Sequence, residues 1–300
     1  MTIKLRWTCK MVSGPHKGAY GVMKMDSTEP SVFVDNFGNL AEKISKFGNR
    51  PKLHPDHLFR GQSDSQWSLE PSFARVAKQR GLCRNKALQL EWESVLKFSM
   101  SAKNLLPLTN TFQLSLQPGR IDLPGWGPLM QHYGAPTRQL DWSMSTWVAL
   151  YFSCYENEES DGALWIADFK KVVDMGNKKL AALKAAQNAT DAFLGLLREP
   201  SAPEIVMFSM AVTSNERIDA QQGRFSLCTN PLANHADEMY AANGLEKIVI
   251  DRSLKSVIME ELHKMNINAS SLFPGIDGLG KSIREFCKLW DNTSQIEVSR

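Results

Sequence analysis

Strand-length apolar runs and segments of helical spacing alternate irregularly along this chain, and this order limits the folds it can adopt. The runs ALWIADF and EIVMFSMAV predict strands at 163–169 and 204–212, and weaker runs predict strands at 57–61, 224–229 and 246–250. Helical spacing predicts helices near 37–48, 86–106, 178–198, 252–265 and 277–290, and another that begins near Ser145. Because no regular strand–helix–strand repeat connects them, we predict an α+β fold with a mixed, mainly antiparallel sheet flanked by helices.

The segment from residue 86 carries the clearest helical pattern. Apolar side chains recur there with a period of about 3.6 residues and predict one buried face, made of Leu88, Trp92, Val95, Ala102 and Leu106. The stretch QPGRIDLPGWGP that follows, at 117–128, is rich in Pro and Gly and predicts a loop.

The chain shows no internal repeat and no linker composition. Its 300 residues, 43% of them hydrophobic, are sufficient for one sizeable core. We therefore predict a single domain over residues 1–300, with residues 1–34 as an N-terminal extension.

The cysteines and the terminal sequence bear on the cellular compartment. Five scattered cysteines form no CxxC pair, which favours reduced thiols and argues against a structural zinc site. The chain begins without the apolar run of a signal peptide, and no stretch approaches the roughly twenty apolar residues of a membrane span. We expect a cytoplasmic protein without a metal site and without a membrane partner.

Charge gives only a weak indication of a partner. The formal net charge is +3, but residues 1–60 hold ten Lys and Arg against five Asp and Glu. An ordinary solvated surface explains this excess, and a surface that faces a polyanion is the alternative.

Three short segments concentrate polar side chains. The first runs from His57 to Arg75 and contains FRGQ, in which an arginine at a strand end could bind an anion as a planar fork. The second, QHYGAPTRQLDWSMS at 131–145, precedes an apolar helix whose N-terminus would favour an anion. The third is AQQGRF at 220–225, whose amides could contact a ligand or satisfy loop backbone groups. Dinucleotide-fold, P-loop, zincin and hydrolase motifs are absent from the sequence.

Together these segments resemble the FRG domain family, named for its Phe-Arg-Gly signature. FRGQ, the spacing from Trp67 to Arg75, QHYGAPTRQLDW, ALYFS, AQQGRF and SLFPGIDGL follow in the family's order, over roughly residues 35–290. The FRG pattern in turn looks like a divergent branch of the ADP-ribosyltransferase superfamily.

That resemblance implies an ADP-ribosyltransferase-like fold and NAD as co-substrate. Residues matching catalytic positions are Arg60, Ser143, Ser145, Gln222 and Gln221, with Ala149 and Phe152 on the following helix. Arg60 would hold phosphate or ribose, the Gly61 backbone would meet the carboxamide, Tyr133 would stack and Arg138 would be a second phosphate ligand. The implied binding set is completed by Phe59, Gln62, His132 and Asp141.

The third segment departs from the superfamily pattern. It offers glutamine where strong transferases carry glutamate, and an amide cannot stabilise a cation by charge. Either another acid, Asp141 or Glu238, serves, or catalysis is weaker, or the domain binds without turnover.

The leading hypothesis is therefore an NAD-dependent ADP-ribosyltransferase. The resemblance suggests a bacterial toxin or phage-defence effector. Its acceptor would be a nucleic acid or a protein, and the basic N-terminal residues slightly favour a nucleic acid. An antitoxin or inhibitor protein could bind it. The alternatives are a catalytically silent binding module and an NAD glycohydrolase, which uses water as acceptor.

Overall fold

A computed structural model describes residues 31–47, 55–102, 105, 116–117, 120–121, 123–183, 188–209 and 216–289. Residues 1–30, most of the expected N-terminal extension, lie outside the described part, as does Leu106 of the expected helical stripe. Ser31–Val34, the last residues of that expected extension, form a strand of the main sheet. Within the described residues, no helix is both long enough and apolar enough to cross a membrane.

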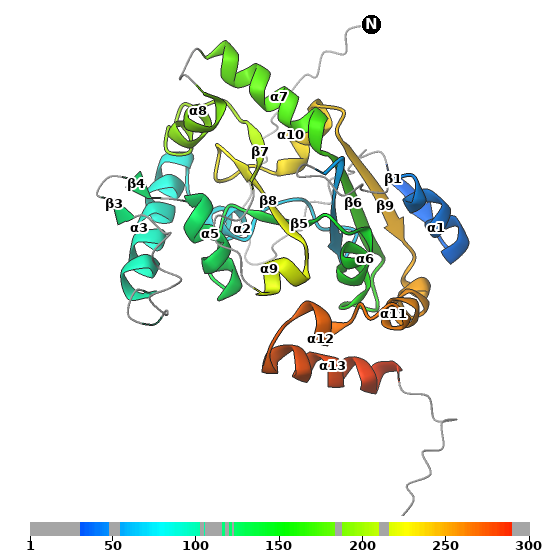
Figure 1. Cartoon of the computed structure of the whole chain (residues 1–300). Coiled ribbons are helices and arrows are strands. Elements are labelled where there is room, and N and C mark those ends of the chain that lie inside the picture. The colour runs from blue at the N-terminus through cyan, green and yellow to red at the C-terminus, as the bar shows by residue number, and fades with distance from the viewer. Residues whose placement is uncertain are drawn as a thin grey trace, which may run out of the picture. The chain divides into compact units, whose positions relative to one another are not determined.

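A seven-stranded sheet with the order β1-β9-β6-β2-β5-β8-β7 forms the centre of the fold (Figure 1). Only the edge pair β1·β9 is parallel, and the other five neighbouring pairs are antiparallel. The predicted α+β class and mainly antiparallel sheet are thus confirmed. The strands are β1 (Ser31–Val34), β2 (His57–Gln62), β5 (Leu140–Ser143), β6 (Gly162–Asp168), β7 (Val206–Ser209), β8 (Gly223–Cys228) and β9 (Leu245–Ile250). A separate small hairpin pairs β3 (Leu116–Gln117) with β4 (Arg120–Ile121).

Helices cover both faces of the sheet, because most central strand positions are apolar on both sides. One core contains Phe59, Leu164 and Ile248 and packs against α1 (Phe37–Ser45), α6 (Thr146–Cys154), α11 (Lys255–Lys264) and α12 (Ala269–Leu272). The core of the opposite face contains Leu58 and Trp165 and packs against α7 (Phe169–Ala182) and α10 (His235–Ala241).

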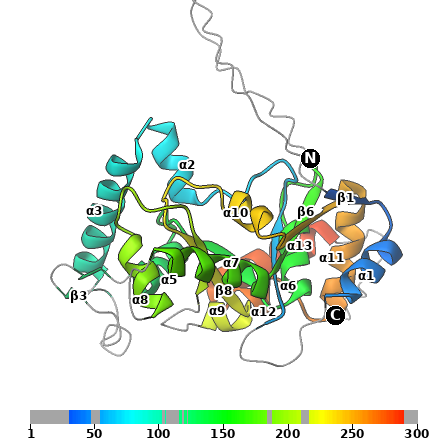
Figure 2. The same cartoon turned by 90° about the horizontal axis from the view of Figure 1, so that it is seen from above.

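Four further helices gather on the side of the fold away from β1 in Figure 2, where α1 and α11 lie next to β1. They are α2 (Ser72–Gln79), α3 (Arg84–Ala102), α5 (Leu123–His132) and α8 (Ala189–Leu196). Short α9 (Glu216–Ala220) precedes β8, a 3₁₀ turn (Arg252–Leu254) precedes α11, and α13 (Ile276–Leu289) follows α12.

Several boundaries differ from the sequence prediction. The helix expected at 178–198 is two helices, α7 and α8, and α7 begins directly after β6 because Asp168 caps it by accepting from the Lys171 N–H. The loop expected at 117–128 gives way at Leu123 to α5, which tolerates Pro124 in its first turn and contains Pro128.

Helix α3 forms where expected, but its buried face is rotated. Of the predicted stripe, Val95 and Ala102 are buried, whereas Leu88 and Trp92 are only partly covered. The fully packed positions on α3 are Ala87, Glu91, Val95, Ser99 and Ala102.

Candidate functional site

The sheet is nearly divided between β2 and β5. Strand β2 pairs with β6 along its whole length, but it meets β5 at the single residue pair Phe59↔Ser143. The next side chain, Arg60, bridges the strands, because its Nη1 donates to the Asp141 main-chain carbonyl at 2.7 Å. The Arg60 side chain thus replaces main-chain hydrogen bonds between β2 and β5, and a gap opens between these two strands.

A cavity of about 180 Å³ lies at this gap. Its walls come from β2, β5, α6, α9 and β8, which are distant in the sequence. Arg60 of the first polar segment, Ser143 of the second and Gln221 of the third all line it. The structure therefore brings one residue from each predicted segment to a common site.

Arg60 is the main charge at the site. The Arg60 side chain is half-buried, and its Nε is buried without a hydrogen-bond partner. Burial lowers the pKa of Arg60, Asp141 opposes this effect and the positive charge of Arg75 adds to it. A buried, incompletely paired guanidinium is a favourable place for an anionic ligand, because the ligand supplies the missing acceptor.

Asp141 places a carboxylate in the same cavity. It is open to the cavity, and the Gln131 amide of α5 donates to its Oδ2. The surrounding protein raises the pKa of Asp141, while Arg60, Arg217 and the Gln131 hydrogen bond act in the opposite direction. Glu238, the other acid considered from the sequence, is instead paired with Lys179 on a different part of the fold.

Ser143 and Gln221 are fixed by local hydrogen bonds. The Ser143 hydroxyl donates to the Gln221 carbonyl at 2.8 Å and accepts from the Ser145 N–H at 2.9 Å. The Gln221 amide donates to the Leu272 carbonyl at 3.0 Å, which ties α9 to α12. These bonds hold β5 and the third segment against each other beside the cavity.

The first two polar segments also decide the family. Residues 55–162, from just before β2 to the start of β6, match the model of the FRG domain family. This chain contains an FRG domain. No curated protein and no solved structure matches the chain. The FRG match includes Arg60, Asp141 and Ser143, whereas Arg217 and Gln221 lie outside the matched residues.

The signature glycine of the FRG domain is required by packing. A Cβ at Gly61 would lie 1.9 Å from the Ala149 carbonyl oxygen and 2.6 Å from the Ser153 nitrogen. Helix α6 therefore packs directly on the main chain of β2. Helix α6 occupies the side of Gly61 that a Cβ would fill, but Gly61 also lines the cavity, so a contact between its backbone and a ligand stays a prediction.

The structure separates the two glutamines of the third segment. Gln221 lines the cavity, whereas Gln222 is exposed, with a positive φ of 50°. The carbonyl of Gln222 accepts from the Met144 N–H at 3.1 Å, so it contributes through its main chain. Ser145 caps α6, because its hydroxyl accepts from the Val148 N–H, and it lies outside the cavity lining.

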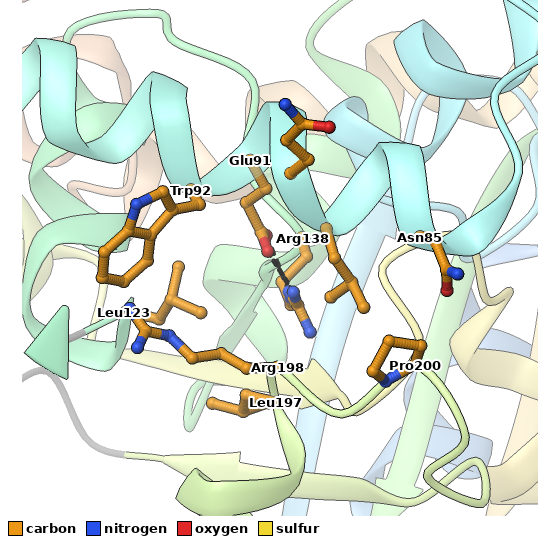
Figure 3. A pocket seen from close by; sticks show the side chains of 10 residues that line it. Asn85, Glu91, Trp92, Leu123, Arg138, Leu197, Arg198 and Pro200 are labelled. Carbon is orange, nitrogen blue, oxygen red and sulfur yellow. Dashed lines mark hydrogen bonds and ion pairs between the residues drawn. The ribbon is translucent and has the colours of Figure 1, made fainter. Parts of the chain in front are cut away.

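Two residues of the expected binding set serve the core instead. Gln62 is buried, accepts from Trp165 Nε1 at 2.6 Å and donates to the Ser68 carbonyl at 3.1 Å. Arg138 is buried and forms a two-pronged ion pair with Glu91 (Figure 3). Its Nη1 also donates to two main-chain carbonyls. In this structure the Arg138 guanidinium is engaged by protein acceptors, so nothing supports its expected role as a phosphate ligand.

The Arg138–Glu91 pair also lines a second cavity of about 300 Å³. The Trp92 ring of α3 lines the same cavity, with the Arg198 guanidinium 3.4 Å from the ring centre (Figure 3). The rest of its lining is largely apolar, and Arg138 is the one lining residue that comes from the three polar segments.

Other members of the expected set lie around the first cavity. Phe59 is a core residue that also lines the cavity. His132 and Tyr133 are exposed at the end of α5, with their rings edge to face at 4.8 Å. Partial desolvation and the nearby Arg217 charge lower the pKa of His132, and Asp277 opposes this shift. Neither ring belongs to the cavity lining, so a stacking role for Tyr133 stays a prediction.

One cationic group beside the cavity was not predicted from the sequence. Arg217 lines it from α9, and its guanidinium lies 4.8 Å from the Phe273 ring centre. Lys281 Nζ lies 3.6 Å from the same ring. Arg217 stands four residues before Gln221, so on a helix both face the same side. That spacing is the signal that could have identified it.

A buried histidine supports the site from the opposite face. His235 Nδ1 is 2.9 Å from the Ser226 hydroxyl, which also accepts from Trp142 Nε1 at 2.9 Å. Its Nε2 is buried without a partner. Burial and the positive charges of Arg60 and Arg138 lower the pKa of His235 to about 3, so the ring is neutral at pH 7. Among the described residues, no cluster of His, Cys, Asp and Glu could hold a metal ion.

Proposed function

We propose that the FRG domain binds NAD at the gap between β2 and β5 and transfers its ADP-ribose to an acceptor. The observation that carries this proposal is the convergence of Arg60, Ser143 and Gln221 on one cavity from three separate segments. These are the positions that the superfamily resemblance assigns to NAD.

The charges around the cavity suit a dinucleotide. Arg60 and Arg217 offer guanidinium groups to a pyrophosphate, and Lys281 adds a third cation beside Phe273. The cavity volume of about 180 Å³ is below the roughly 300–1,000 Å³ of pockets that bury a whole drug-sized ligand. It therefore suits one end of the dinucleotide, with the remainder extending over the cationic side.

Asp141 can supply the charge that the third segment lacks. Cleavage of the nicotinamide bond builds positive charge on the ribose, and a carboxylate held nearby stabilises that charge. Asp141 is the acidic side chain of the cavity lining; burial raises its pKa, and the positive charges of Arg60 and Arg217 counteract that shift and so favour the ionised form. In this proposal Gln221 positions the ribose and Asp141 provides the electrostatic stabilisation.

Binding without turnover is the second candidate, and Gln221 is the observation that favours it. Its amide already donates to the Leu272 carbonyl, and it carries no charge. An NAD glycohydrolase would share the first step and use water as the acceptor. For a transferase, the basic residues 1–60 favour a nucleic acid over a protein as acceptor, in keeping with a toxin or defence effector.

The test measures binding and chemistry separately. Calorimetry with NAD reports binding, and labelled NAD incubated with RNA, DNA or protein pools reports nicotinamide release and label transfer. Arg60→Ala is expected to weaken NAD binding by roughly 10- to 100-fold, the loss of about 1.5–3 kcal/mol for a charge-assisted contact. Arg60→Lys should restore little, because an ammonium lacks the planar fork. Arg80→Ala, an exposed arginine after α2, is the matched control.

Each result separates the candidates. Label transfer supports the transferase, release into water alone supports the glycohydrolase, and binding without release supports the silent module. Absence of NAD binding by the wild-type protein, or normal binding by Arg60→Ala, would overturn the proposed site.

A further inference from the structure

Helix α13 is held with a polar face toward the protein. Glu285 is 2% exposed; its carboxylate accepts from the Tyr151 hydroxyl and from the Ala269 N–H at 3.0 Å, and lies 3.2 Å from His263 Nε2. A Cβ at Gly278 would clash with the Phe273 carbonyl oxygen, so α13 lies directly on the turn after α12. These contacts fix the rotation of the helix about its axis.

The opposite face of α13 is apolar and open to solvent. Ile276, Leu279, Ile283 and Phe286 are 80%, 53%, 56% and 56% exposed. Their spacing of three, four and three residues places them in one stripe along the helix. In Figure 1, α13 lies at the lower margin of the fold, below α12. An amphipathic helix normally buries such a stripe, so this face has the character of an interface.

We propose that a second copy of this chain covers the stripe, through antiparallel packing of α13 against α13. The spacing matches the a and d positions of two heptads. In an antiparallel pair, Ile276 lies opposite Phe286 of the other copy and Leu279 lies opposite Ile283. The two-fold axis generates each of these two contacts twice, so the same stripe of each copy forms both sides of the interface.

The side chains that flank the stripe favour a second copy. Gly280, Ser282 and Cys287 border it, and they are small and uncharged. Two helices can therefore approach closely, without like charges facing each other across the contact.

Two of the three basic residues of α13 are engaged with their own chain. Lys281 lies over the Phe273 ring, and Lys288 pairs with Glu158 at 2.6 Å. Arg284 is exposed, but a membrane-surface helix directs several cations to lipid headgroups, so this single arginine argues against a lipid surface.

The available area indicates a reversible dimer. Four large apolar side chains at these exposures offer roughly 500 Å² per copy, a patch of interface size. Two copies would bury about 1,000 Å², close to the lower limit of about 1,200 Å² for stable interfaces. The dimer population should therefore rise with protein concentration.

Sedimentation velocity of the full chain over a concentration series tests the proposal. The wild-type protein should move from monomer to dimer, and Ile283→Asp should weaken association by about 100-fold, because it places a charge in each copy of an apolar contact. Val257→Asp, at a comparably exposed position on α11, is the matched control and should dimerise normally. Circular dichroism should show the same folded state for both variants. A wild-type protein that stays monomeric, with or without binding to anionic vesicles, overturns the proposal, as does an Ile283→Asp variant that still dimerises.

Cysteine cross-linking tests the direction of packing. With Cys9, Cys83 and Cys287 replaced by serine, Gly280→Cys lies near the two-fold axis and should form a disulfide between copies. Ile276→Cys lies far from the axis and should not. Efficient cross-linking through Ile276→Cys alone would contradict the antiparallel arrangement.

Discussion

Replacing Arg138 with methionine should destabilise the protein by about 3–5 kcal/mol. Arg138 is 2% exposed and Glu91 is 5% exposed, and two hydrogen bonds join them. The single variant leaves the Glu91 carboxylate buried without its partner, and breaking a buried ion pair in this way costs about that much. Glu91→Leu should cost a similar amount, because it leaves the guanidinium unpaired.

The double variant should be more stable than either single one. Glu91→Leu with Arg138→Met removes both charges and fills the volume with apolar groups. Its remaining cost comes from the Cys228 and Thr229 carbonyls, which lose Arg138 as a donor. The Thr229 carbonyl keeps Arg84 Nη2 as a donor at 3.4 Å, so the remaining cost is about that of one unpaired buried carbonyl, about 1–3 kcal/mol. The two single effects should therefore fail to add by several kcal/mol.

Urea unfolding at pH 7, followed by circular dichroism, gives the four free energies of this cycle. Lys264→Met removes the exposed pair with Glu261 and is the control, which should change stability little. Arg138→Met should also keep its NAD affinity per folded molecule. Two results would refute the structural role and return Arg138 to the ligand site. The first is that the free-energy changes of the two single variants add up to that of the double variant, and the second is a stable Arg138→Met variant that loses NAD binding.

Three further outcomes are expected. Gly61→Ala should cost several kcal/mol in urea unfolding, because its Cβ would overlap main-chain atoms of α6, whereas Gly195→Ala on α8, which meets nothing within 4 Å, should be neutral or stabilising. Burial lowers the pKa of His235 to about 3 and keeps the ring neutral, so its contribution to the free energy of unfolding is complete above about pH 6.5 and falls as the pH drops toward 3. When the free energy of unfolding is measured against pH, His235→Gln should show a shallower slope over this range than the wild-type protein. An unchanged slope would contradict the assignment. Asp141→Asn should abolish nicotinamide release while Glu238→Gln retains it, and the reverse result would place the acid outside the cavity.

The sequence contained most of the information about local structure. Apolar strand runs and helical spacing located strands β2, β6, β7, β8 and β9 and the helices that begin near Ser145 and within the C-terminal residues, since backbone geometry and burial impose periods of 2 and 3.6. Strand β5, which lies within the polar second segment, was not predicted. The order of the FRG segments also led to the expectation that Arg60, Asp141 and Ser143 lie close together, and in the structure all three line one cavity.

Only tertiary structure decided which polar side chains remain available to a ligand. Arg138 and Gln62 look like their site neighbours in sequence, but Glu91 and Trp165 satisfy them from elements dozens of residues away. The buried Glu91 also turned α3 away from its most apolar stripe, because an ion pair needs both partners inside. In the same way, Glu285 turned the apolar stripe of α13 outward. The type and spacing of a residue show which hydrogen bonds and ion pairs its side chain can form. Long-range packing decides which partner the side chain contacts, because a buried polar group must be paired with a group that the fold places beside it.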